Sequence, residues 1–540
     1  MHGLMMDQPL LISMIMKYAE QAFPESEVVS VTHDHPEHRY TYRDAFRRAR
    51  KLANALDRLG MQQGDRIATL AWNDFRHFEL YYGVSCSGAV LHTINPRLFT
   101  DQLAYIINHA EDRWVFTDPL FIPLLEGLQT ELPSVEGFVI LTDQAQMPDT
   151  SLKNAISYEA LISDETDEYE WPVLDEQTAS SLCYTSGTTG HPKGVLYSHR
   201  STVIHAITAV MPSVVGLSDR DVVMPVVPMF HVNAWGLPYT APLAGARLVL
   251  PGPKMGDGAS LHQLISQEQV SLALGVPTVW LALLNFLKES GKGLESLSRV
   301  IVGGAACPQS IMDRLREYGV DTHHAWGMTE MSPIGTLNNL KASLSDIAQD
   351  TKDALRLSQG RAIFGVAMKI VNDTGERLPH DGVAVGDLYV RGPGVCSAYY
   401  QRESEVSNTH DKEGWFATGD VAAIDDEGYL HITDRSKDVI KSGGEWISSI
   451  ELENLAMSHP AVAEAAVIAV PHEKWNERPL LVVVKQAGET LDKTSLLSWY
   501  EGKVAQWWIP DDVIFVHELP HTATGKVKKL ALREQFVTTR

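Results

Sequence analysis

Short apolar runs recur along much of the chain, and segments with a helical pattern separate them. The runs are Ile67–Trp72, Val90–Ile94, Phe138–Thr142, Leu272–Val276 and Val300–Val302. This alternation is typical of β-sheets covered by helices. Because 540 residues are also enough for more than one core, the sequence predicts a large α/β body with several sheets.

The sequence also predicts one capped helix near the N-terminal end and a separate domain near the C-terminal end. Residues 41–60 predict one helix, because Thr41 can cap it with Asp44 three residues later and Gly60 can end it. After Asp434 the pattern becomes that of a smaller α+β domain with its own core. The expected elements there are a helix at Ile447–Ser458, strands at Ala465–Val470 and Leu480–Lys485, a further helix, and a strand at Val513–Val516.

Charge, cysteine content and hydropathy exclude several classes of protein. Acidic residues outnumber basic ones, 68 to 45, and the net charge of −23 disfavours nucleic acid and anionic lipid as partners. The four cysteines lie far apart without a Cys-x-x-Cys pair, so we expect no zinc cluster or disulfide framework, and a cytoplasmic location. The uncharged stretch Val222–Ala246 has the length of a membrane span. Four prolines interrupt it, so a buried strand and loop are expected instead of an integral membrane segment.

The strongest local signal for chemistry is the stretch from Tyr184 to Gly194, Tyr-Thr-Ser-Gly-Thr-Thr-Gly-His-Pro-Lys-Gly. Its glycines leave backbone N–H groups open to an anion, its hydroxyls add donors, and Lys193 adds a positive charge. It is not a Walker loop, because the Gly-x-x-x-x-Gly-Lys-Ser/Thr spacing is absent. Gly-Thr-Thr-Gly alone would more often be a polar turn, but the whole string is more specific and predicts a phosphate-binding loop.

This loop resembles the phosphate-binding loop of the acyl-adenylate-forming superfamily, which comprises acyl-CoA synthetases, adenylation domains of peptide synthetases and beetle-type luciferases. Further motifs similar to those of the superfamily follow in order: Trp326–Glu330, Gly414–Asp420, Asp434–Asp438 and Thr524–Lys526. Within the superfamily, Pro228–Trp235 and Lys441–Ser448 look most like bacterial medium-chain fatty acyl-CoA synthetases and 3-methylmercaptopropionate-CoA ligases.

The resemblance implies an acyl-CoA synthetase-like fold with an N-terminal domain at 1–433, a hinge at 434–437 and a mobile C-terminal domain at 438–540. It implies an acid–thiol ligase that converts a carboxylate, ATP and coenzyme A into an acyl-CoA, AMP and pyrophosphate through an acyl-adenylate. The expected acid is a short- or medium-chain aliphatic acid or 3-methylmercaptopropionate. Mg²⁺ is the expected metal ion. Homodimers are frequent among relatives, but no interface can be identified from the sequence.

The first half-reaction needs positive charge around the α-phosphate, because the carboxylate attacks it and expels pyrophosphate. The resemblance assigns the adenylation lysine to Lys526; the neighbouring Lys528 and Lys529 are expected to be solvated. Glu330 matches the Mg²⁺ ligand, in keeping with the preference of a hard cation for carboxylate oxygen. The residues implied to act in catalysis are Lys526, Lys441, Thr185 and Glu330.

Nucleotide binding is implied for several further motif residues. Asp420 would accept hydrogen bonds from both ribose hydroxyls, Arg435 would hold the ribose from the other side, and Trp326 would stack on the base or line a pocket. Taken alone, Asp420 and Arg435 would as often be surface residues. The full implied set is Thr185, Ser186, Gly187, Thr188, Thr189, Gly190, Lys193, Gly303, Gly304, Ala305, Trp326, Gly327, Met328, Thr329, Asp420, Arg435 and Lys526.

The resemblance also implies sites for the thiol and the acid. The hinge position matches Lys437, and the implied coenzyme A segment consists of Lys441, Gly443, Gly444, Glu445 and Trp446. The implied acid pocket consists of His231, Trp235, Gly303, Trp326, Met328, Pro333 and Ile334. His231 stands where peptide-synthetase domains carry Asp, which disfavours an amino acid substrate. Trp235 either shortens the pocket or is simply part of the core, and the sequence leaves both open.

Two other functions stay open at this point. One is an adenylating enzyme that loads a separate carrier protein instead of coenzyme A. The other is a non-catalytic nucleotide-binding scaffold that has kept the fold and lost the chemistry. The presence of Lys193, Glu330, Asp420, Arg435 and Lys526 argues against the scaffold.

Overall fold

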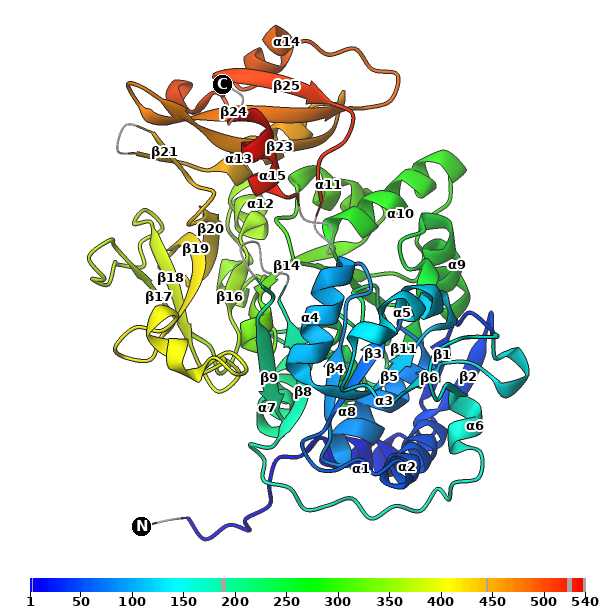
Figure 1. Cartoon of the computed structure of the whole chain (residues 1–540). Coiled ribbons are helices and arrows are strands. Elements are labelled where there is room, and N and C mark those ends of the chain that lie inside the picture. The colour runs from blue at the N-terminus through cyan, green and yellow to red at the C-terminus, as the bar shows by residue number, and fades with distance from the viewer. Residues whose placement is uncertain (2, 186–190, 443–444, 522–526, 538–540) are drawn as a thin grey trace.

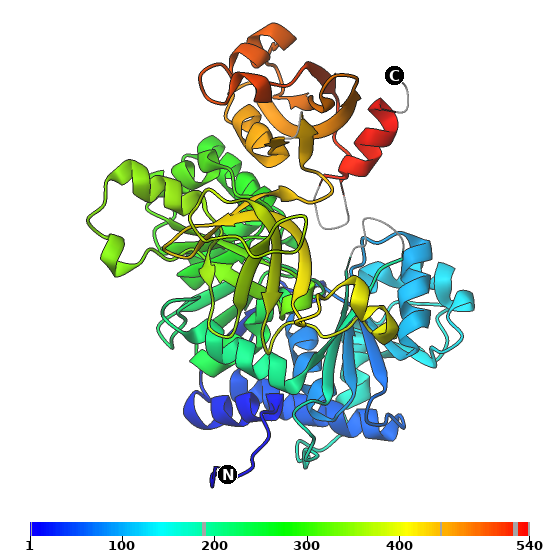
Figure 2. The ribbon, with the colours of Figure 1, turned by 90° about the vertical axis from the view of Figure 1, so that its left-hand side faces the viewer.

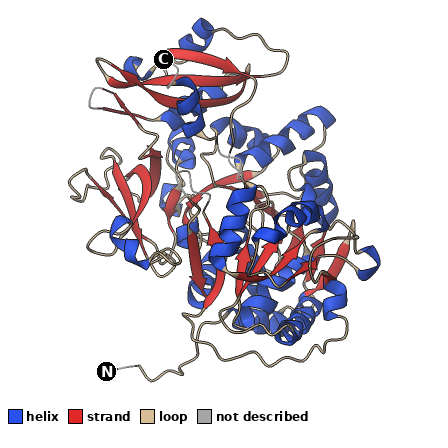
Figure 3. Ribbon diagram, in the orientation of Figure 1, coloured by secondary structure: helices blue, strands red, loops and turns tan. Residues whose placement is uncertain are grey.

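The computed structural model describes residues 1, 3–185, 191–442, 445–521 and 527–537. Their strands form two large sheets in one body and a smaller sheet in a C-terminal unit at one end of the molecule (Figures 1 and 2). Helices cover the sheets throughout (Figure 3). The expected α/β class, with a large multi-sheet body and a small C-terminal domain, is confirmed.

The first sheet of the body has seven strands within the described residues, in the order β7-β6-β5-β3-β4-β8-β9. Neighbouring strands are parallel except β8 and β9. Their bounds are Ile156–Ser157 (β7), Gly137–Ile140 (β6), Asp112–Thr117 (β5), Arg66–Leu70 (β3), Val90–Thr93 (β4), Ala179–Tyr184 (β8) and Gly194–Ser198 (β9).

The second sheet has thirteen strands in the described part, in the order β17-β18-β19-β20-β16-β15-β14-β13-β12-β10-β11-β1-β2. Strands from β14 through β1 are parallel, and the remaining pairs are antiparallel. Their bounds are Ala367–Val371 (β17), Gly386–Arg391 (β18), Phe416–Ile424 (β19), Tyr429–Arg435 (β20), Gly360–Ala362 (β16), Ile334–Leu337 (β15), Asp321–Gly327 (β14), Arg299–Val302 (β13), Leu272–Gly275 (β12), Val222–Pro225 (β10), Arg247–Leu250 (β11), Glu27–Ser30 (β1) and His38–Thr41 (β2).

The helices of the body pack on these sheets. They are α1 (Ile12–Ala22), α2 (Tyr42–Arg58), α3 (Phe75–Cys86), α4 (Thr100–Ala110), α5 (Ile122–Leu128), α6 (Tyr158–Ile162), α7 (His199–Val210), α8 (Leu237–Ala244), α9 (Gly258–Glu268), α10 (Pro277–Ser290), α11 (Gln309–Glu317) and α12 (Gln349–Leu357). Every residue of α3 is buried, so this helix is surrounded by the core. No helix of the described residues is long and apolar enough to span a membrane.

The C-terminal unit has its own sheet and core. Its strands are β21 (Ile440–Ser442), β22 (Glu445–Ile447), β23 (Val462–His472), β24 (Asn476–Lys485) and β25 (Asp512–Val516), and its helices are α13 (Ser449–Met457), α14 (Lys493–Ser498) and α15 (Lys529–Phe536). Strand β24 lies between β21 and β23 and also pairs with β25. Buried Ile440, Val467, Leu481 and Tyr500 belong to one core cluster, so the unit has an apolar interior of its own.

Several local expectations are confirmed, and two need correction. Strands β3, β4, β6, β12 and β13 occur at the apolar runs, and α2 has the predicted capping box between Thr41 and Asp44. The helix expected from residue 447 begins at Ser449, because Ile447 pairs with Ile440 in the hairpin β21–β22.

The second correction concerns Val222–Ala246, which contains the helix α8 as well as a strand and a loop. Pro242 lies inside α8 and has no N–H to donate to the carbonyl of Pro238. The buried Tyr82 hydroxyl donates to that carbonyl at 2.8 Å instead. A contact from a distant helix thus permits a proline that the sequence pattern treats as a breaker.

Candidate functional site

Strand ends from both sheets carry the candidate site. Parallel pairing places Val302 of β13 opposite His324 of β14, so residues 303–305 and Trp326 follow at the same edge of the sheet. In the other sheet, β8 ends at Tyr184, and the Thr185 N–H donates to the Lys193 carbonyl at 2.9 Å. The predicted phosphate-loop residues Ser186, Gly187, Thr188, Thr189 and Gly190 lie outside the described residues.

Lys193 and Glu330 both contact Tyr399, a residue that the sequence did not indicate. The Lys193 Nζ lies 4.7 Å from the ring centroid of Tyr399, and the hydroxyl of the same tyrosine donates to Glu330 Oε1 at 2.6 Å. Burial raises the pKa of Glu330, while the Tyr399 hydroxyl and the nearby charges of Arg435 and Lys193 oppose this rise. The neighbouring Thr329 is buried as well.

Asp420 joins Trp326 and Arg435. Its Oδ2 accepts from the Trp326 indole N–H at 3.0 Å, and its Oδ1 lies 2.9 Å from Arg435 Nε. Strands β19 and β20 place Asp420 and Arg435 directly opposite each other. A carboxylate with two acceptor oxygens is a group that can bind a ligand diol. The Arg435 side chain is 40% exposed and that of Asp420 only 3%, so the arginine is the more accessible partner.

A left-handed turn precedes α8 and carries Trp235. The φ angles of residues 232–235 are 41°, 56°, 47° and 56°, a region that non-glycine residues rarely adopt. Asn233 fastens the turn to two other elements. Its amide donates to Ser181 Oγ at 3.0 Å, and its carbonyl oxygen accepts from the Tyr81 hydroxyl at 3.2 Å.

Trp235 and Gly303 are neighbours. The indole is 7% exposed, and a Cβ added at Gly303 would lie 3.0 Å from its Cη2 atom. Glycine at this position therefore lets the indole approach the backbone at the end of β13. His231, which is half-buried, stands directly before the turn.

His205 of α7 connects this turn with the segment after β14. Its Nε2 accepts from the Ile334 N–H at 3.3 Å, and burial lowers its pKa to about 4, so the ring is neutral at pH 7. A Cβ added at Gly236 would lie 2.7 Å from the other ring nitrogen. The Met328 N–H donates to the Pro333 carbonyl at 3.0 Å. The predicted acid-pocket residues thus fall on adjoining segments.

The predicted hinge residue Lys437 lies in the turn between β20 and β21. Strand β20 includes Asp434 and Arg435, so the predicted hinge at 434–437 begins inside a strand. Desolvation lowers the pKa of Lys437, and the nearby positive charges of Arg435 and Arg533 act in the same direction.

One of the two lysines expected to be solvated, Lys529, is not. Lys529 Nζ lies 2.6 Å from a Glu453 carboxylate oxygen and donates to Ser449 Oγ at 2.5 Å. Lys528 Nζ lies 4.6 Å from the ring centroid of Phe99, which belongs to the body. A buried carboxylate needs a cation, and this requirement is invisible in the basic run itself. Lys526 lies outside the described residues.

The predicted coenzyme A segment forms the hairpin β21–β22. Lys441 is exposed, with its Nζ 5.9 Å from the ring centroid of Trp446; Gly443 and Gly444 lie outside the described residues, and Glu445 is the first residue of β22. Trp446 lines a cavity of about 820 Å³ between the body and the C-terminal unit. Ala306 of the body also lines this cavity. It follows the predicted Gly303, Gly304 and Ala305 directly in the sequence.

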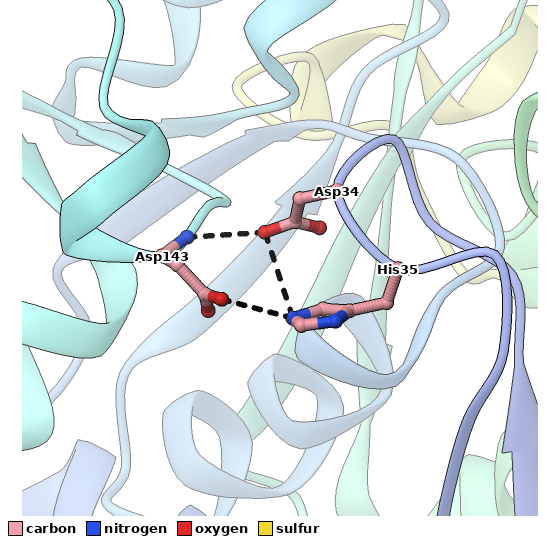
Figure 4. Close-up of side chains that lie close together, drawn as sticks. All are labelled: Asp34, His35 and Asp143. Atoms are coloured by element: carbon pink, nitrogen blue, oxygen red, sulfur yellow. Dashed lines mark hydrogen bonds and ion pairs between the residues drawn. The ribbon is translucent and has the colours of Figure 1, made fainter.

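A separate charged cluster, formed by Asp34, His35 and Asp143, has the spacing of a metal site, with ligand atoms within 4.8 Å (Figure 4). Both oxygens of Asp34 already accept from Arg76, at 3.0 and 2.9 Å, and one also accepts from the Asp143 N–H at 3.1 Å. Burial alone would raise the pKa of Asp34, but the Arg76 contacts hold it well below its usual range. The cluster is therefore explained as an ion-pair network around the buried pair of Asp34 and Arg76.

Four residues that the sequence did not single out contact the predicted site. They are Tyr399, His205, Asn233 and Tyr197, whose hydroxyl donates to the Thr329 carbonyl at 2.5 Å. One signal was available for Tyr399, because two adjacent tyrosines follow a glycine-containing turn after β18. The other three lie on segments whose neighbours in space cannot be inferred from spacing along the chain.

Comparison with known proteins adds to this geometry. The chain matches the AMP-binding enzyme family over residues 17–400 and the AMP-binding enzyme C-terminal domain over residues 451–526. It is 53% identical to a 3-methylmercaptopropionyl-CoA ligase of Ruegeria lacuscaerulensis over 99% of both chains. It is 51% identical to a medium-chain-fatty-acid–CoA ligase of Ectopseudomonas oleovorans, over 99% of this chain and 98% of the relative. The solved structure of the anthranilate CoA ligase AuaEII in complex with anthranoyl-AMP superposes with a TM-score of 0.87 at 26% identity and covers 98% of both chains.

Proposed function

The chain belongs to the AMP-binding enzyme family, and from this premise we propose that it is an AMP-forming acyl-CoA ligase. It converts a carboxylic acid, ATP and coenzyme A into an acyl-CoA, AMP and pyrophosphate. Its acids are medium-chain fatty acids and 3-methylmercaptopropionate, as the names of its relatives suggest. The two kinds of acid differ by little more than a sulfur atom in place of a methylene, so one apolar pocket can accept both.

One observation carries the proposal: charged residues from distant parts of the sequence converge at the ends of β8 and β14. Lys193 and Glu330 share Tyr399 as a contact, while Asp420 joins Trp326 and Arg435. A buried carboxylate near a lysine suits a triphosphate with its cation, and a carboxylate–arginine pair suits a ribose diol. A non-catalytic scaffold would not need both of these charged groups.

In the first half-reaction, the substrate carboxylate attacks the α-phosphorus of ATP, the bond from phosphorus to the bridging oxygen breaks, and pyrophosphate leaves. Lys193 and Lys526 stabilise the negative charge that builds on the phosphoryl oxygens. Asp420 and Arg435 hold the ribose and thereby fix the nucleotide. Trp235 and Gly303 bound the space for the acyl chain.

A magnesium ion fits the donor set at Glu330. The residue offers carboxylate oxygen and is buried near Lys193, and only its Oε1 accepts from Tyr399. Mg²⁺ takes one or two carboxylates and completes its shell with phosphate oxygens and water. When bound, the ion would neutralise part of the negative charge of the phosphates. Glu330 would hold it, with Thr329 hydrogen-bonding the phosphate.

In the second half-reaction, the thiol of coenzyme A attacks the acyl carbon of the adenylate and AMP leaves. We propose that the C-terminal domain turns about Lys437 between the two steps, withdraws Lys526 and presents the segment from Lys441 to Trp446. The position of Lys437 in a turn between β20 and β21 supports this role. A reducing cytoplasm is the proposed location, supported by the four free cysteines.

Acyl-CoA formation across an acid panel tests the function. Purified protein is incubated with Mg-ATP, coenzyme A and acetate, butyrate, hexanoate, octanoate, palmitate, benzoate or 3-methylmercaptopropionate, and both pyrophosphate and thioester are measured. We expect thioester with a maximum at four to eight carbons or with the methylthio acid. Pyrophosphate release without thioester would instead indicate a carrier protein as acceptor. Absence of both products would contradict the ligase and favour a scaffold.

A further inference from the structure

Tyr399 lies between two parts of the candidate phosphate site that differ in charge. It belongs to the loop between β18 and β19 and is 8% exposed. Backbone hydrogen bonds fix this loop on both sides. The Cys396 N–H donates to the Glu330 carbonyl, and the Tyr400 N–H donates to the Gly194 carbonyl, each at 2.8 Å. The tyrosine is thus attached to the segments of both Glu330 and Lys193.

Its side chain contacts both charged groups. The hydroxyl donates to Glu330 Oε1 at 2.6 Å, and the ring centroid lies 4.7 Å from Lys193 Nζ. Lys193 and Glu330 have opposite charges and are both described, yet no ion pair within 4.0 Å joins them.

We propose that Tyr399 is a positioning residue for ATP, which keeps Lys193 and Glu330 apart. An ammonium and a carboxylate that face each other in a partly buried site attract strongly. A direct pair would occupy both groups, and ATP could bind only after the pair separated, which lowers the apparent affinity. A neutral ring with a hydroxyl contacts both groups and leaves the charge of each available for the triphosphate and its cation. This inference rests on the proposed function of the same site.

Two variants separate the contribution of the tyrosine ring from that of its hydroxyl. Tyr399→Phe keeps the ring beside Lys193 and loses only the hydrogen bond to Glu330. Tyr399→Leu removes the aromatic ring, so the lysine loses its cation–π contact and can approach the carboxylate. If spacing by the ring is the function, the phenylalanine variant stays close to the native protein and the leucine variant does not.

The test is equilibrium binding of Mg-ATP to the full chain without carboxylic acid, together with steady-state kinetics. For Tyr399→Leu we expect the dissociation constant and the KM for ATP to rise about ten-fold. The KM for the acid and kcat should stay within about three-fold of native values. Tyr399→Phe should bind Mg-ATP within about three-fold of the native protein. The matched control is Tyr389→Leu, because Tyr389 also has a lysine near its ring, Lys369 at 5.6 Å; its ATP affinity should not change.

Native ATP affinity in folded Tyr399→Leu would overturn the inference. Equal loss in the phenylalanine and leucine variants would also overturn it, because the hydroxyl and not the ring would then be responsible. Thermal unfolding checks that each variant folds, and Tyr399→Met replaces the leucine variant if that one does not. The proposed function fails separately, since in that case the native protein itself would form no acyl-CoA.

Discussion

Trp235→Ala should shift the acid preference toward longer chains. The indole is almost fully buried and lies against the end of β13, where a Cβ at Gly303 would be 3.0 Å from its Cη2 atom. Replacing it by a methyl group vacates space directly beside the region where the acyl chain is proposed to bind. The vacated space, lined by apolar groups, is then available to additional methylenes of the substrate.

The magnitude follows from the transfer free energy of methylene groups. Each methylene that becomes buried contributes about 0.8 kcal/mol. Accommodation of about three methylenes therefore favours the longer acid by about 2.4 kcal/mol, which is about 60-fold in the ratio of kcat/KM values. Loss of the buried indole also lowers the free energy of unfolding by about 3–5 kcal/mol.

The assay is kcat/KM for saturated acids from four to sixteen carbons. Trp114→Ala is the control, because Trp114 is also 7% exposed but lies on β5 in the other sheet; this variant should lose stability without a change of preference. Gly303→Ala should act in the opposite direction and favour shorter acids. An unchanged chain-length profile in folded Trp235→Ala would refute the reasoning and make the indole a core residue only.

Three further predictions concern the C-terminal domain and stability. Lys437→Pro should impair thioester formation far more than ATP–pyrophosphate exchange; equal losses in both assays would count against the hinge. Phe99→Ala removes the ring beside Lys528. Since an exposed cation–π contact contributes about 0.5–1 kcal/mol, the rate of adenylation should fall about two- to five-fold. The rate of thioester formation from supplied acyl-adenylate should not change. The Asp34 pKa is depressed from its ordinary 3.8, so stabilisation by its pair with Arg76 is present above about pH 4 and is lost as the pH falls further. Arg76→Met should lower the free energy of unfolding by about 3–5 kcal/mol at pH 7. In urea unfolding, the free energy of unfolding of this variant should also fall less steeply below pH 4 than that of the native protein. An unchanged pH dependence would contradict this.

Local signals predicted much of the fold. The apolar runs at β3, β4, β6, β12 and β13 and the Thr41–Asp44 cap of α2 depend on residues close in sequence. Helix α8 could not be predicted in this way, because its internal proline is accommodated by the hydroxyl of Tyr82 on α3. Sequence patterns do not contain such long-range contacts.

In the candidate site, too, local motifs indicated some residues, whereas long-range contacts determine the others. Lys193, Glu330, Asp420 and Arg435 were indicated by their motifs, each of which is a short local string. Tyr399 was missed because its importance depends on two contacts with residues 69 and more than 200 positions away. Lys529 was misjudged for a similar reason, since the basic run around it reveals nothing of the buried Glu453 that it neutralises.

The left-handed turn before α8 has a consequence for engineering. Four successive non-glycine residues with positive φ cost about 4–8 kcal/mol in total at about 1–2 kcal/mol each, which is comparable to the stability of a whole domain. Glycine at Ala234 would relieve part of this cost with the loss of only a methyl group, whereas Val232 is 5% exposed and its replacement would lose a buried side chain. A screen for heat resistance would therefore favour glycine at Ala234. The same change would loosen the support of Trp235, so selection for thermostability alone would broaden the range of acids that the protein accepts.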